Sequence, residues 1–231
     1  MEKINIYFFE SLPSTNSYAK ENISALSLPA LILANGQTNG RGRQGNSFFS
    51  PSDTGLYMTA VFPAPSDCGL LTPLAAVSVC ESLEKYGIEP KIKWVNDVFV
   101  NTKKICGILT ELFTYGKNQY IALGVGINLT TKVFPSELSQ AGSAEIKCNK
   151  KQLALDILNR IFYYIKKNNC TPIIENYRSR LFILGKQITY SKNGICYSAT
   201  VTDINSQCNL IVKRADGTED TLSSGEISIK I

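Results

Sequence analysis

The sequence contains no histidine. Imidazole is the side chain that ordinarily moves protons near neutral pH, so any reaction here must proceed without a histidine base. Ser-His-Asp and Cys-His catalytic arrangements are therefore excluded. The seven cysteines are odd in number, and no two of them form a C-x-x-C pair. A disulfide framework and a zinc site are both disfavoured, and a reducing cytoplasm is the expected location.

Long apolar runs and a strong charge bias are also missing. No stretch approaches the roughly 18 apolar residues of a membrane span, and the first residues lack the apolar core of a signal peptide, so we expect no membrane partner. The net charge is only +5, from 24 Lys+Arg and 19 Asp+Glu. This balance fits an anionic small-molecule substrate or an acidic partner, but it is too weak and too evenly spread to indicate nucleic acid.

The chain has 231 residues, of which 44% are hydrophobic, and this suits one moderate domain or a large and a small one. Hydrophobic periodicity predicts the secondary structure. The expected strands are 4–9, 29–34, 55–62, 91–94 and 119–129, with a hairpin made by 98–100 and 105–113. The expected helices are about 15–23, capped by Ser14, about 72–87, capped by Thr72, 150–167, and 171 to about 185.

This order of elements predicts an α+β fold, with a mixed sheet flanked by helices over residues 1–184. From about residue 185 the character changes, because short β-rich runs alternate with turns such as Asn193-Gly194. Residues 185–231 are therefore expected to form a small β-barrel or few-stranded sheet. This unit is too short for a large core of its own, so it should pack on the larger one.

A glycine-rich stretch at 35–46 is the clearest local signal. Four glycines, at 36, 40, 42 and 45, are interspersed with Arg41 and Arg43. Glycine allows close backbone approach, and arginine binds phosphate or carboxylate through two hydrogen bonds at a time. The pattern predicts a loop that folds over an anion, and a solvated Arg-Gly linker is the alternative. Residues 40–45 match G-x-G-x-x-G, but no helix pattern follows and Asn46 replaces the P-loop lysine, so both of those nucleotide motifs are rejected.

Two further segments carry side chains suited to a nucleotide. Lys93, Asn96 and Asp97 lie where a predicted strand ends, and such a set fits a nucleoside triphosphate with Mg²⁺, although a simple turn has the same composition. Lys104 opens a strand that contains Gly107, and a strand glycine often marks close approach by a ligand. Lys104 is thus expected to point into a pocket, or else to be a surface lysine of the hairpin turn.

In this order the segments resemble the biotin protein ligases. The resemblance rests on Ser14-Thr15-Asn16, Gln37, residues 40–45, 93–97, 104–108 and 124–128, and a C-terminal signature at Ser224–Ser228. It implies a biotin/lipoate-ligase-like catalytic domain, related to class II aminoacyl-tRNA synthetases, followed by an SH3-like β-barrel. Bifunctional members carry a DNA-binding helix-turn-helix before the first of these segments. Only 13 residues precede it here, so a monofunctional form that does not bind DNA is expected.

The resemblance also implies a two-step reaction. Biotin and MgATP would give biotinyl-5′-adenylate and pyrophosphate, and a lysine of a biotin carboxyl carrier domain would then attack the adenylate and release AMP. The carrier would belong to a biotin-dependent carboxylase, and a homodimer is left open.

The site residues follow from the same resemblance. Biotin would be bound by Ser14, Thr15, Asn16, Gln37, Gly40, Arg41, Lys104 and Gly107. ATP would be bound by Arg43, Phe48, Lys93, Asn96, Asp97 and Asn128, with Mg²⁺ on Asp97. Arg43 and Lys104 would be catalytic, because they offset the repulsion between two anions.

This chain departs from the family pattern at two of these places. Val95 stands where proline is usual, and Phe48 stands where tryptophan is usual. Phe48 is still aromatic, so we expect it to stack on adenine or to cap the loop. Neither change removes a reacting group.

Two other functions stay open at this point. A lipoate or octanoate ligase would share the fold, although the glycine loop favours biotin. A non-enzymatic nucleotide- or nucleic-acid-binding module would use the Arg-Gly loop as its contact patch. Such a module predicts a stronger basic bias than +5 and has no need of the Lys93–Asp97 and Lys104 segments.

Overall fold

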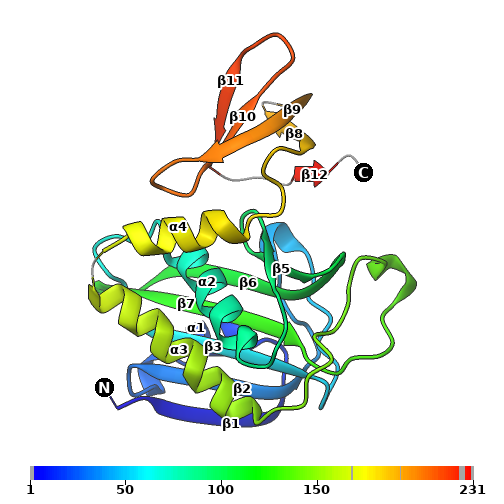
Figure 1. The fold of residues 1–231 in the computed structure, drawn as a ribbon. Coiled ribbons are helices and arrows are strands. Elements are labelled where there is room, and N and C mark those ends of the chain that lie inside the picture. The colour runs from blue at the N-terminus through cyan, green and yellow to red at the C-terminus, as the bar shows by residue number, and fades with distance from the viewer. Residues whose placement is uncertain (1–2, 168, 193, 224–226, 230–231) are drawn as a thin grey trace.

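The computed structural model describes residues 3–167, 169–192, 194–223 and 227–229. Its centre is a seven-stranded mixed sheet, with the C-terminal strands above it in Figure 1. In spatial order the large sheet runs β1 (Asn5–Leu12), β2 (Ala30–Gln37), β3 (Gly55–Pro63), β7 (Asn118–Asn128), β6 (Lys103–Tyr115), β5 (Asp97–Val100) and β4 (Lys91–Lys93). The β1–β2 pair is parallel and the other neighbours are antiparallel. The predicted α+β class with a mixed sheet is confirmed.

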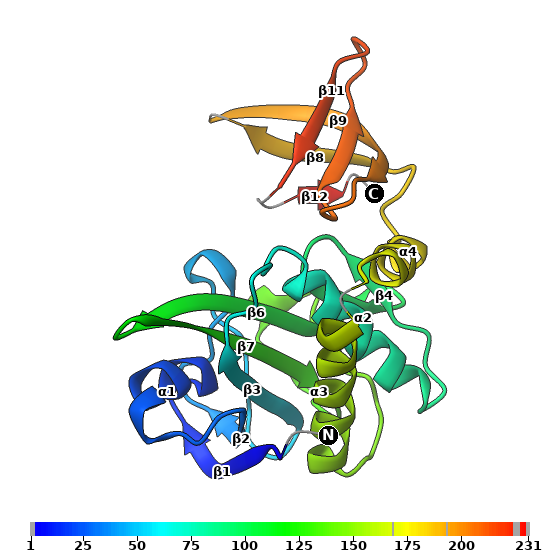
Figure 2. The ribbon, with the colours of Figure 1, turned by 90° about the vertical axis from the view of Figure 1, so that its left-hand side faces the viewer.

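The two faces of this sheet are covered by different helices. Figure 2 shows α1 (Thr15–Glu21) on one side, and α2 (Leu71–Glu84) and α3 (Lys150–Lys167) on the other. Successive residues of a strand point to opposite faces, and β2 follows this rule. Leu31 and Leu33 join the main core under α2 and α3, whereas Ile32 and Ala34 join a smaller cluster with Ala19 of α1. The candidate site lies on the α1 face.

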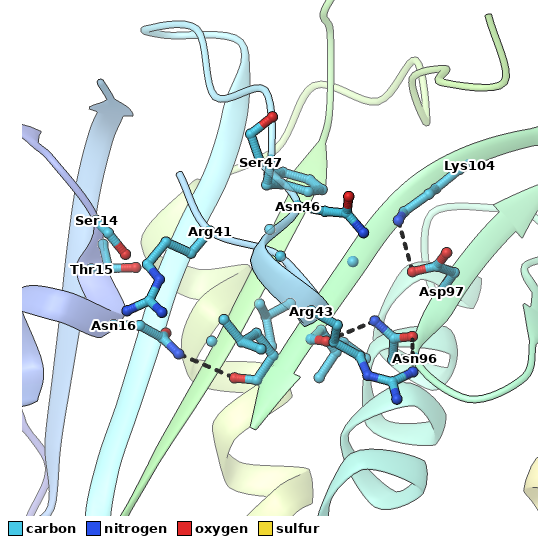
Figure 3. A pocket seen from close by; sticks show the side chains of 18 of the residues that line it. Ser14, Thr15, Asn16, Arg41, Arg43, Asn46, Ser47, Asn96, Asp97 and Lys104 are labelled. Carbon is cyan, nitrogen blue, oxygen red and sulfur yellow. Dashed lines mark hydrogen bonds and ion pairs between the residues drawn. The ribbon is translucent and has the colours of Figure 1, made fainter. Parts of the chain in front are cut away.

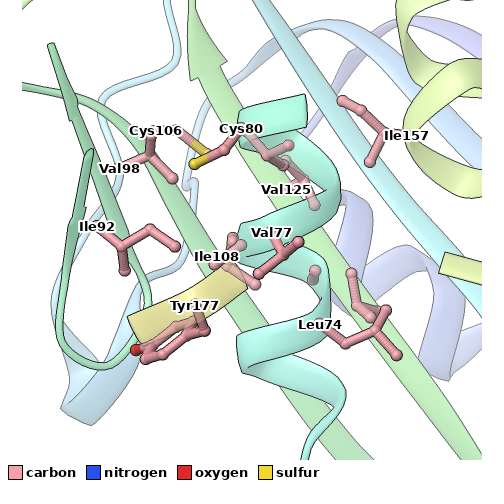
Figure 4. Close-up of a cluster of buried hydrophobic side chains, with 14 of the residues drawn as sticks. Leu74, Val77, Cys80, Ile92, Val98, Cys106, Ile108, Val125, Ile157 and Tyr177 are labelled. Atoms are coloured by element: carbon pink, nitrogen blue, oxygen red, sulfur yellow. The ribbon is translucent and has the colours of Figure 1, made fainter. Parts of the chain in front are cut away.

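The main core joins the helices to the sheet and continues into the C-terminal unit. Its central side chains come from α2, from four strands and from α4 (Thr171–Arg180), as Figure 4 shows for Leu74, Val77, Cys80, Ile92, Val98, Ile108, Val125 and Tyr177. Ile188, Val201 and Leu210 of the C-terminal unit belong to the same cluster. The expected packing of that unit on the larger one is confirmed.

Two predicted helix ends are wrong. The helix α2 begins at Leu71, so Thr72 does not cap it but lies in its first turn, where its hydroxyl donates to Thr110 Oγ1 at 2.9 Å. The helix α4 ends at Arg180, short of Gly185. Leu181 adopts an extended conformation and forms a parallel β-bridge with Ile92. The apolar residues that follow Leu181 are then part of the core. By contrast, α1 begins as predicted, with the Ser14 hydroxyl accepting from the Ser17 amide.

The C-terminal unit is a five-stranded antiparallel sheet. Its order is β11 (Glu219–Leu222), β10 (Leu210–Lys213), β9 (Ile195–Ile204), β8 (Gln187–Lys192) and β12 (Ile227–Ile229). The arrangement is SH3-like, but among the described residues no ladder joins β11 to β12, so the barrel is not closed. Ser224–Glu226 of the expected signature lie outside the described residues. No helix in the described part of the chain is long and apolar enough to cross a membrane.

Candidate active site

A cavity of about 330 Å³ opens on the α1 face of the large sheet. The start of α1, the glycine loop, the turn after β4 and the strands β6 and β7 all contribute to its walls (Figure 3). The structure brings the predicted residues together here, apart from Gly40 and Asn128. Those that line the cavity are Ser14, Thr15, Asn16, Gln37, Arg41, Arg43, Phe48, Lys93, Asn96, Asp97, Lys104 and Gly107.

One end of the cavity is a network of neutral hydrogen bonds. Gln37 Oε1 accepts from the Thr15 amide at 2.8 Å and from the Thr15 hydroxyl at 3.1 Å, and Gln37 Nε2 donates to Ser50 Oγ at 2.8 Å. The buried hydroxyl of Thr59 lies 2.6 Å from Asn16 Oδ1 and 2.8 Å from Thr15 Oγ1. These bonds hold the side chains of Thr15, Asn16 and Gln37 in place. This end is suited to a polar but uncharged group.

Three glycines on the strands β6 and β7 leave space that the side chains of Phe48 and Asn16 occupy. Gly107 and Gly126 face each other across β6 and β7, and a Cβ on them would lie 3.2 and 2.5 Å from the Phe48 ring. A Cβ on Gly124 would lie 2.2 Å from Asn16 Oδ1. The close approach expected at Gly107 is therefore made by Phe48, which rests on bare backbone at the cavity wall. Any larger residue at 126 would displace the ring.

The glycine loop folds back on itself across the cavity mouth. The Phe48 amide donates to the Gly40 carbonyl at 2.8 Å, and the Gly42 amide donates to the Asn46 carbonyl at 2.7 Å. Gly45 has φ +80°, a left-handed conformation that glycine adopts without strain. Gly40 lies just outside the lining, and a Cβ there would be 2.3 Å from the Phe48 carbonyl oxygen, so only glycine fits. The loop is therefore a hydrogen-bonded hairpin and not a solvated linker.

The two arginines of this loop reach toward different walls. Arg43 Nη1 donates to Asn96 Oδ1 at 3.2 Å, on the turn after β4. Arg41 Nη1 lies 4.0 Å from Glu111 Oε1, on β6. Figure 3 shows the two side chains diverging from the loop, with Arg41 near Asn16. The loop therefore spans the cavity and carries a cation at each side of it.

Lys104 points into the cavity, as one of the two sequence interpretations expected. Its Nζ forms an ion pair with Asp97 Oδ1 at 2.8 Å, and its backbone is held between the Gln140 carbonyl and the Gly142 amide. The surface lysine of the hairpin turn is its neighbour Lys103, whose Nζ donates to the Ser139 carbonyl. A cation and a carboxylate thus stand side by side where the predicted nucleotide segments meet.

Asn128 does not reach the cavity lining. It is buried, and its Nδ2 donates to the Gly142 carbonyl at 3.0 Å. Because Gly142 also bonds the Lys104 backbone, Asn128 supports the segment that holds Lys104. Its predicted contact with ATP stays a prediction.

The described residues contain no group of three His, Cys, Asp or Glu side chains that could hold a metal ion. Among the lining residues, Asp97 supplies the carboxylate, and Asn96 supplies an amide. Mg²⁺ is commonly bound by one or two carboxylates together with substrate phosphates. The donors present therefore fit an Mg²⁺ ion that enters with a nucleotide, and they do not form a protein-only cage.

Several residues at the site were not anticipated from the sequence. Leu109 supplies apolar surface to the lining, whereas Met58 and Val125, which also border the cavity, have their side chains in the main core. Trp94 also lines the cavity, and its Nε1 donates to the Cys208 carbonyl of the C-terminal unit at 2.9 Å. Glu111 was missed as well, although it falls two and four residues from Leu109 and Gly107, on the same face of β6. The alternation of side chains along a strand could therefore have indicated from the sequence that Glu111 lies on the same face as Gly107.

Comparison with known proteins places this geometry in a family. Residues 8–128 match the family model described as the Biotin/lipoate A/B protein ligase family, and residues 183–230 match the Biotin protein ligase C terminal domain. The chain belongs to the biotin/lipoate A/B protein ligase family. The expected family resemblance is confirmed over both parts of the chain.

Curated relatives in this ligase family are similar over part of their length. The Bifunctional ligase/repressor BirA of Bacillus subtilis is 32% identical over 149 residues, which are 61% of this chain and 46% of that protein. The Biotin--[acetyl-CoA-carboxylase] ligase of Paracoccus denitrificans is 34% identical over 124 residues, which are 50% of this chain and 51% of that protein. The match thus spans about half the length of these curated relatives.

Solved structures of ligases in this family share the whole fold. The biotin protein ligase from Aquifex aeolicus in complex with biotin and ATP has a TM-score of 0.84 and 24% identity, over 98% of each chain. The Leishmania major enzyme in complex with biotinyl-5-AMP has a TM-score of 0.63 and 26% identity, over 95% of this chain and 99% of that one. At 24% identity, the similarity to the Aquifex aeolicus structure shows a shared fold and nothing further.

Proposed function

We propose that this chain is a biotin protein ligase, which activates biotin with ATP to biotinyl-5′-AMP and transfers it to a lysine of a biotin carboxyl carrier domain. The observation that carries the proposal is that a neutral hydrogen-bonding end and the two cations Arg43 and Lys104 line the same cavity. The names of the curated relatives and the ligands in the related structures support biotin over other acids.

The neutral end matches the chemistry of biotin. A ureido ring offers two N–H donors and one carbonyl acceptor, and Ser14, Thr15 and Gln37 carry hydroxyl and amide groups at the wall. Leu109 supplies apolar surface, and the Phe48 ring adds more, for a fused ring and its aliphatic chain. Asn16, Gly40, Arg41 and Gly107 complete the proposed biotin site, Gly40 and Arg41 through the loop backbone.

The charged end matches the first chemical step. A biotin carboxylate oxygen attacks the α-phosphorus of ATP, a C–O–P bond forms, and the bond to pyrophosphate breaks. Lys104 and Arg43 offset the repulsion between the two anions and hold them within reach of each other. Phe48, Lys93, Asn96 and Asn128 complete the proposed ATP site. Asp97 would hold Mg²⁺ with the phosphates, and this ion would neutralise charge on the leaving pyrophosphate.

The second step needs no acid or base that the chain lacks. The carrier's neutral lysine amine attacks the acyl carbon of the adenylate, an amide bond forms, and the C–O bond to AMP breaks while the amine loses a proton. Arg43 and the loop would keep the adenylate in place until the carrier arrives. The seven-cysteine pattern supports a cytoplasmic location, and the modest charge supports a protein that does not bind DNA specifically.

We also propose that residues 1–184 form the catalytic domain and residues 185–231 a separate C-terminal domain, joined near the end of α4. The carrier itself would be the biotin carboxyl carrier domain of a biotin-dependent carboxylase.

The proposal is tested by ATP–pyrophosphate exchange, assayed with biotin, with lipoate or with no acid. Exchange that depends on biotin supports it. Exchange that depends on lipoate or octanoate would reassign the chain within the family, and no acid-dependent exchange by a folded protein would favour a binding module. The assay isolates the first step, so the carrier is not required.

A further inference from the structure

A carboxylate behind the cavity wall connects three elements of the site. Glu111 does not line the cavity, and its side chain is 20% exposed. Its Oε1 forms an ion pair with Lys20 Nζ of α1 at 2.7 Å, and its Oε2 accepts from Asn16 Nδ2 at 2.9 Å. Arg41 Nη1 of the glycine loop lies 4.0 Å from Oε1. Strand, helix and loop therefore meet at one acidic group.

The contact with Asn16 is a fixed one. Both hydrogens of Asn16 Nδ2 are used, one toward Glu111 and one toward the Leu109 carbonyl at 3.2 Å, and Oδ1 accepts from Thr59. The amide also packs against the bare backbone of Gly124. Glu111 and Asn16 thus form a rigid support, which does not need to rearrange when the loop moves.

The contact with Arg41 is a loose one. The Arg41 side chain is 46% exposed, and among the described residues Glu111 is the only acidic side chain within ion-pair distance of it. Arg43, two residues away, bonds to Asn96 on a different wall. Because Arg41 belongs to the glycine loop and Glu111 to β6, the distance between them depends on where the loop lies relative to the sheet.

We propose that Glu111 is a positioning residue that latches the glycine loop over the adenylate through Arg41. This inference rests on the proposed function. Burial by itself would raise the pKa of Glu111, but hydrogen bonds from Lys20 and Asn16, together with the charges of Lys20 and Arg41, outweigh it and lower that pKa. The carboxylate is therefore ionised at neutral pH and available to the guanidinium.

The experiment measures how fast preformed, radiolabelled biotinyl-5′-AMP leaves the full-length protein when excess unlabelled biotin and ATP are added. Four variants are compared with the wild type: E111Q, R41Q, the double variant and K20M. E111Q keeps an acceptor for Asn16 but loses the charge and the acceptor that faces Lys20, which is why K20M is included, and R41Q keeps the loop backbone. A half-exposed ion pair contributes up to about 1 kcal/mol, so each of these two variants should release the adenylate about two- to fivefold faster.

Two comparisons distinguish a latch from a general loss of rigidity at the site: the effect of the double variant on adenylate release, and the salt dependence of that release. In a latch, the double variant releases the adenylate no faster than either single variant, because both remove the same interaction. Release from the wild type should accelerate with added salt more steeply than release from E111Q, since the exposed pair is screened while the contacts of Arg43 and Lys104 are common to both proteins. K20M, which removes the other cation on Glu111, should not accelerate release.

Three outcomes would overturn the latch: unchanged release in E111Q, multiplicative effects in the double variant, or equal acceleration in K20M. R41Q changes an exposed side chain, so its release rate and salt dependence remain decisive if E111Q folds poorly. A wild-type protein that forms no adenylate would overturn the proposed function and the latch with it. Normal adenylate formation with unchanged release in the variants would overturn the latch alone.

Discussion

Individual charges decide how the proposed first step can proceed. In the structure, Lys104 is paired with Asp97 and Arg43 with Asn96, so both proposed catalytic cations already have a partner within the chain. Two reacting anions must therefore replace these internal partners. Mg²⁺ on Asp97 would free Lys104 for the carboxylate and the phosphate, which links the order of ligand binding to one ion pair.

Replacement of Lys104 by alanine should reduce adenylate formation on the order of 100- to 1,000-fold, because one preorganised contact with the transition-state charge is lost. Stability should hardly change, since the Lys104–Asp97 pair is partly exposed and such pairs contribute little. The measurement is pyrophosphate release together with a thermal unfolding midpoint. Lys103→Ala is the matched control and should retain activity. Near-normal pyrophosphate release by folded Lys104→Ala would refute the role of Lys104.

Elements position these charges through backbone contacts between distant segments. Lys104 is the second residue of β6, and the segment 140–142 pairs with its backbone on one side. Asn128, the last residue of β7, holds that segment by its side chain. The three pieces form a small brace at the end of the sheet.

Replacement of Asn128 by alanine should loosen this brace. The half-buried Gly142 carbonyl would lose its hydrogen bond from Nδ2, and a typical hydrogen bond of this kind contributes about 0.5–1.5 kcal/mol. Hydrogen exchange at the amides of Lys104 and Gly142 should become faster, and adenylate formation should fall with it. The comparison is amide exchange in the two proteins without ligands. Unchanged protection at Lys104, with reduced affinity for ATP, would instead support a direct contact between Asn128 and the nucleotide.

At the scale of the whole molecule, the C-terminal sheet is tied to the site by Trp94, the single tryptophan of the chain. Tyr177 of α4 supports the same turn from behind, since its hydroxyl donates to the Val95 carbonyl at 2.9 Å. The stability of the C-terminal sheet therefore bears on the geometry of the cavity.

Within that sheet, Asp220 accepts from Lys192, Tyr190 and Arg214. The hydrogen bonds, led by that from Lys192, lower the pKa of Asp220 from 3.8 to about 2. A lowered folded-state pKa contributes stability that is complete above pH 3.8 and is lost as the pH falls toward about 2. Asp220→Asn should therefore be less stable than the wild type near pH 5, and the difference should shrink between about pH 3.8 and 2. Denaturation midpoints across this range test it, and a constant difference would contradict it.

The overall reaction should carry the pH signature of an enzyme without histidine. The nucleophile of the transfer step is the carrier's lysine, with a reference pKa of about 10.4, and only its neutral form attacks. Asp97, the only carboxylate among the described lining residues, is already paired with Lys104. Single-turnover transfer from preformed adenylate should thus rise about tenfold per pH unit from about pH 6 to 9. A plateau by about pH 7 would point to an assisted lysine.

The success of sequence-based prediction differs between elements for a physical reason. The strand β7 and the helix α3 were predicted closely, because their periodic apolar residues reflect burial that neighbours along the chain already encode. The end of α4 was not, because Leu181 leaves the helix to pair with Ile92, which lies far away in sequence. Thr72 resembled a cap, but its hydroxyl is used by Thr110 on another element.

The sequence by itself determined the residue types and the order of the segments that make the site. The glycine loop, the Lys93–Asp97 turn and Lys104 could be recognised because their function depends on local spacing and on intrinsic chemistry. Tertiary structure alone decided which groups meet. Lys104 faces Asp97 through strand pairing, Glu111 reaches Asn16 across 95 residues, and Trp94 reaches Cys208 across 114. The two long-range contacts are set by how helix, strands and the two sheets pack together, a non-local property that neither composition nor periodicity encodes.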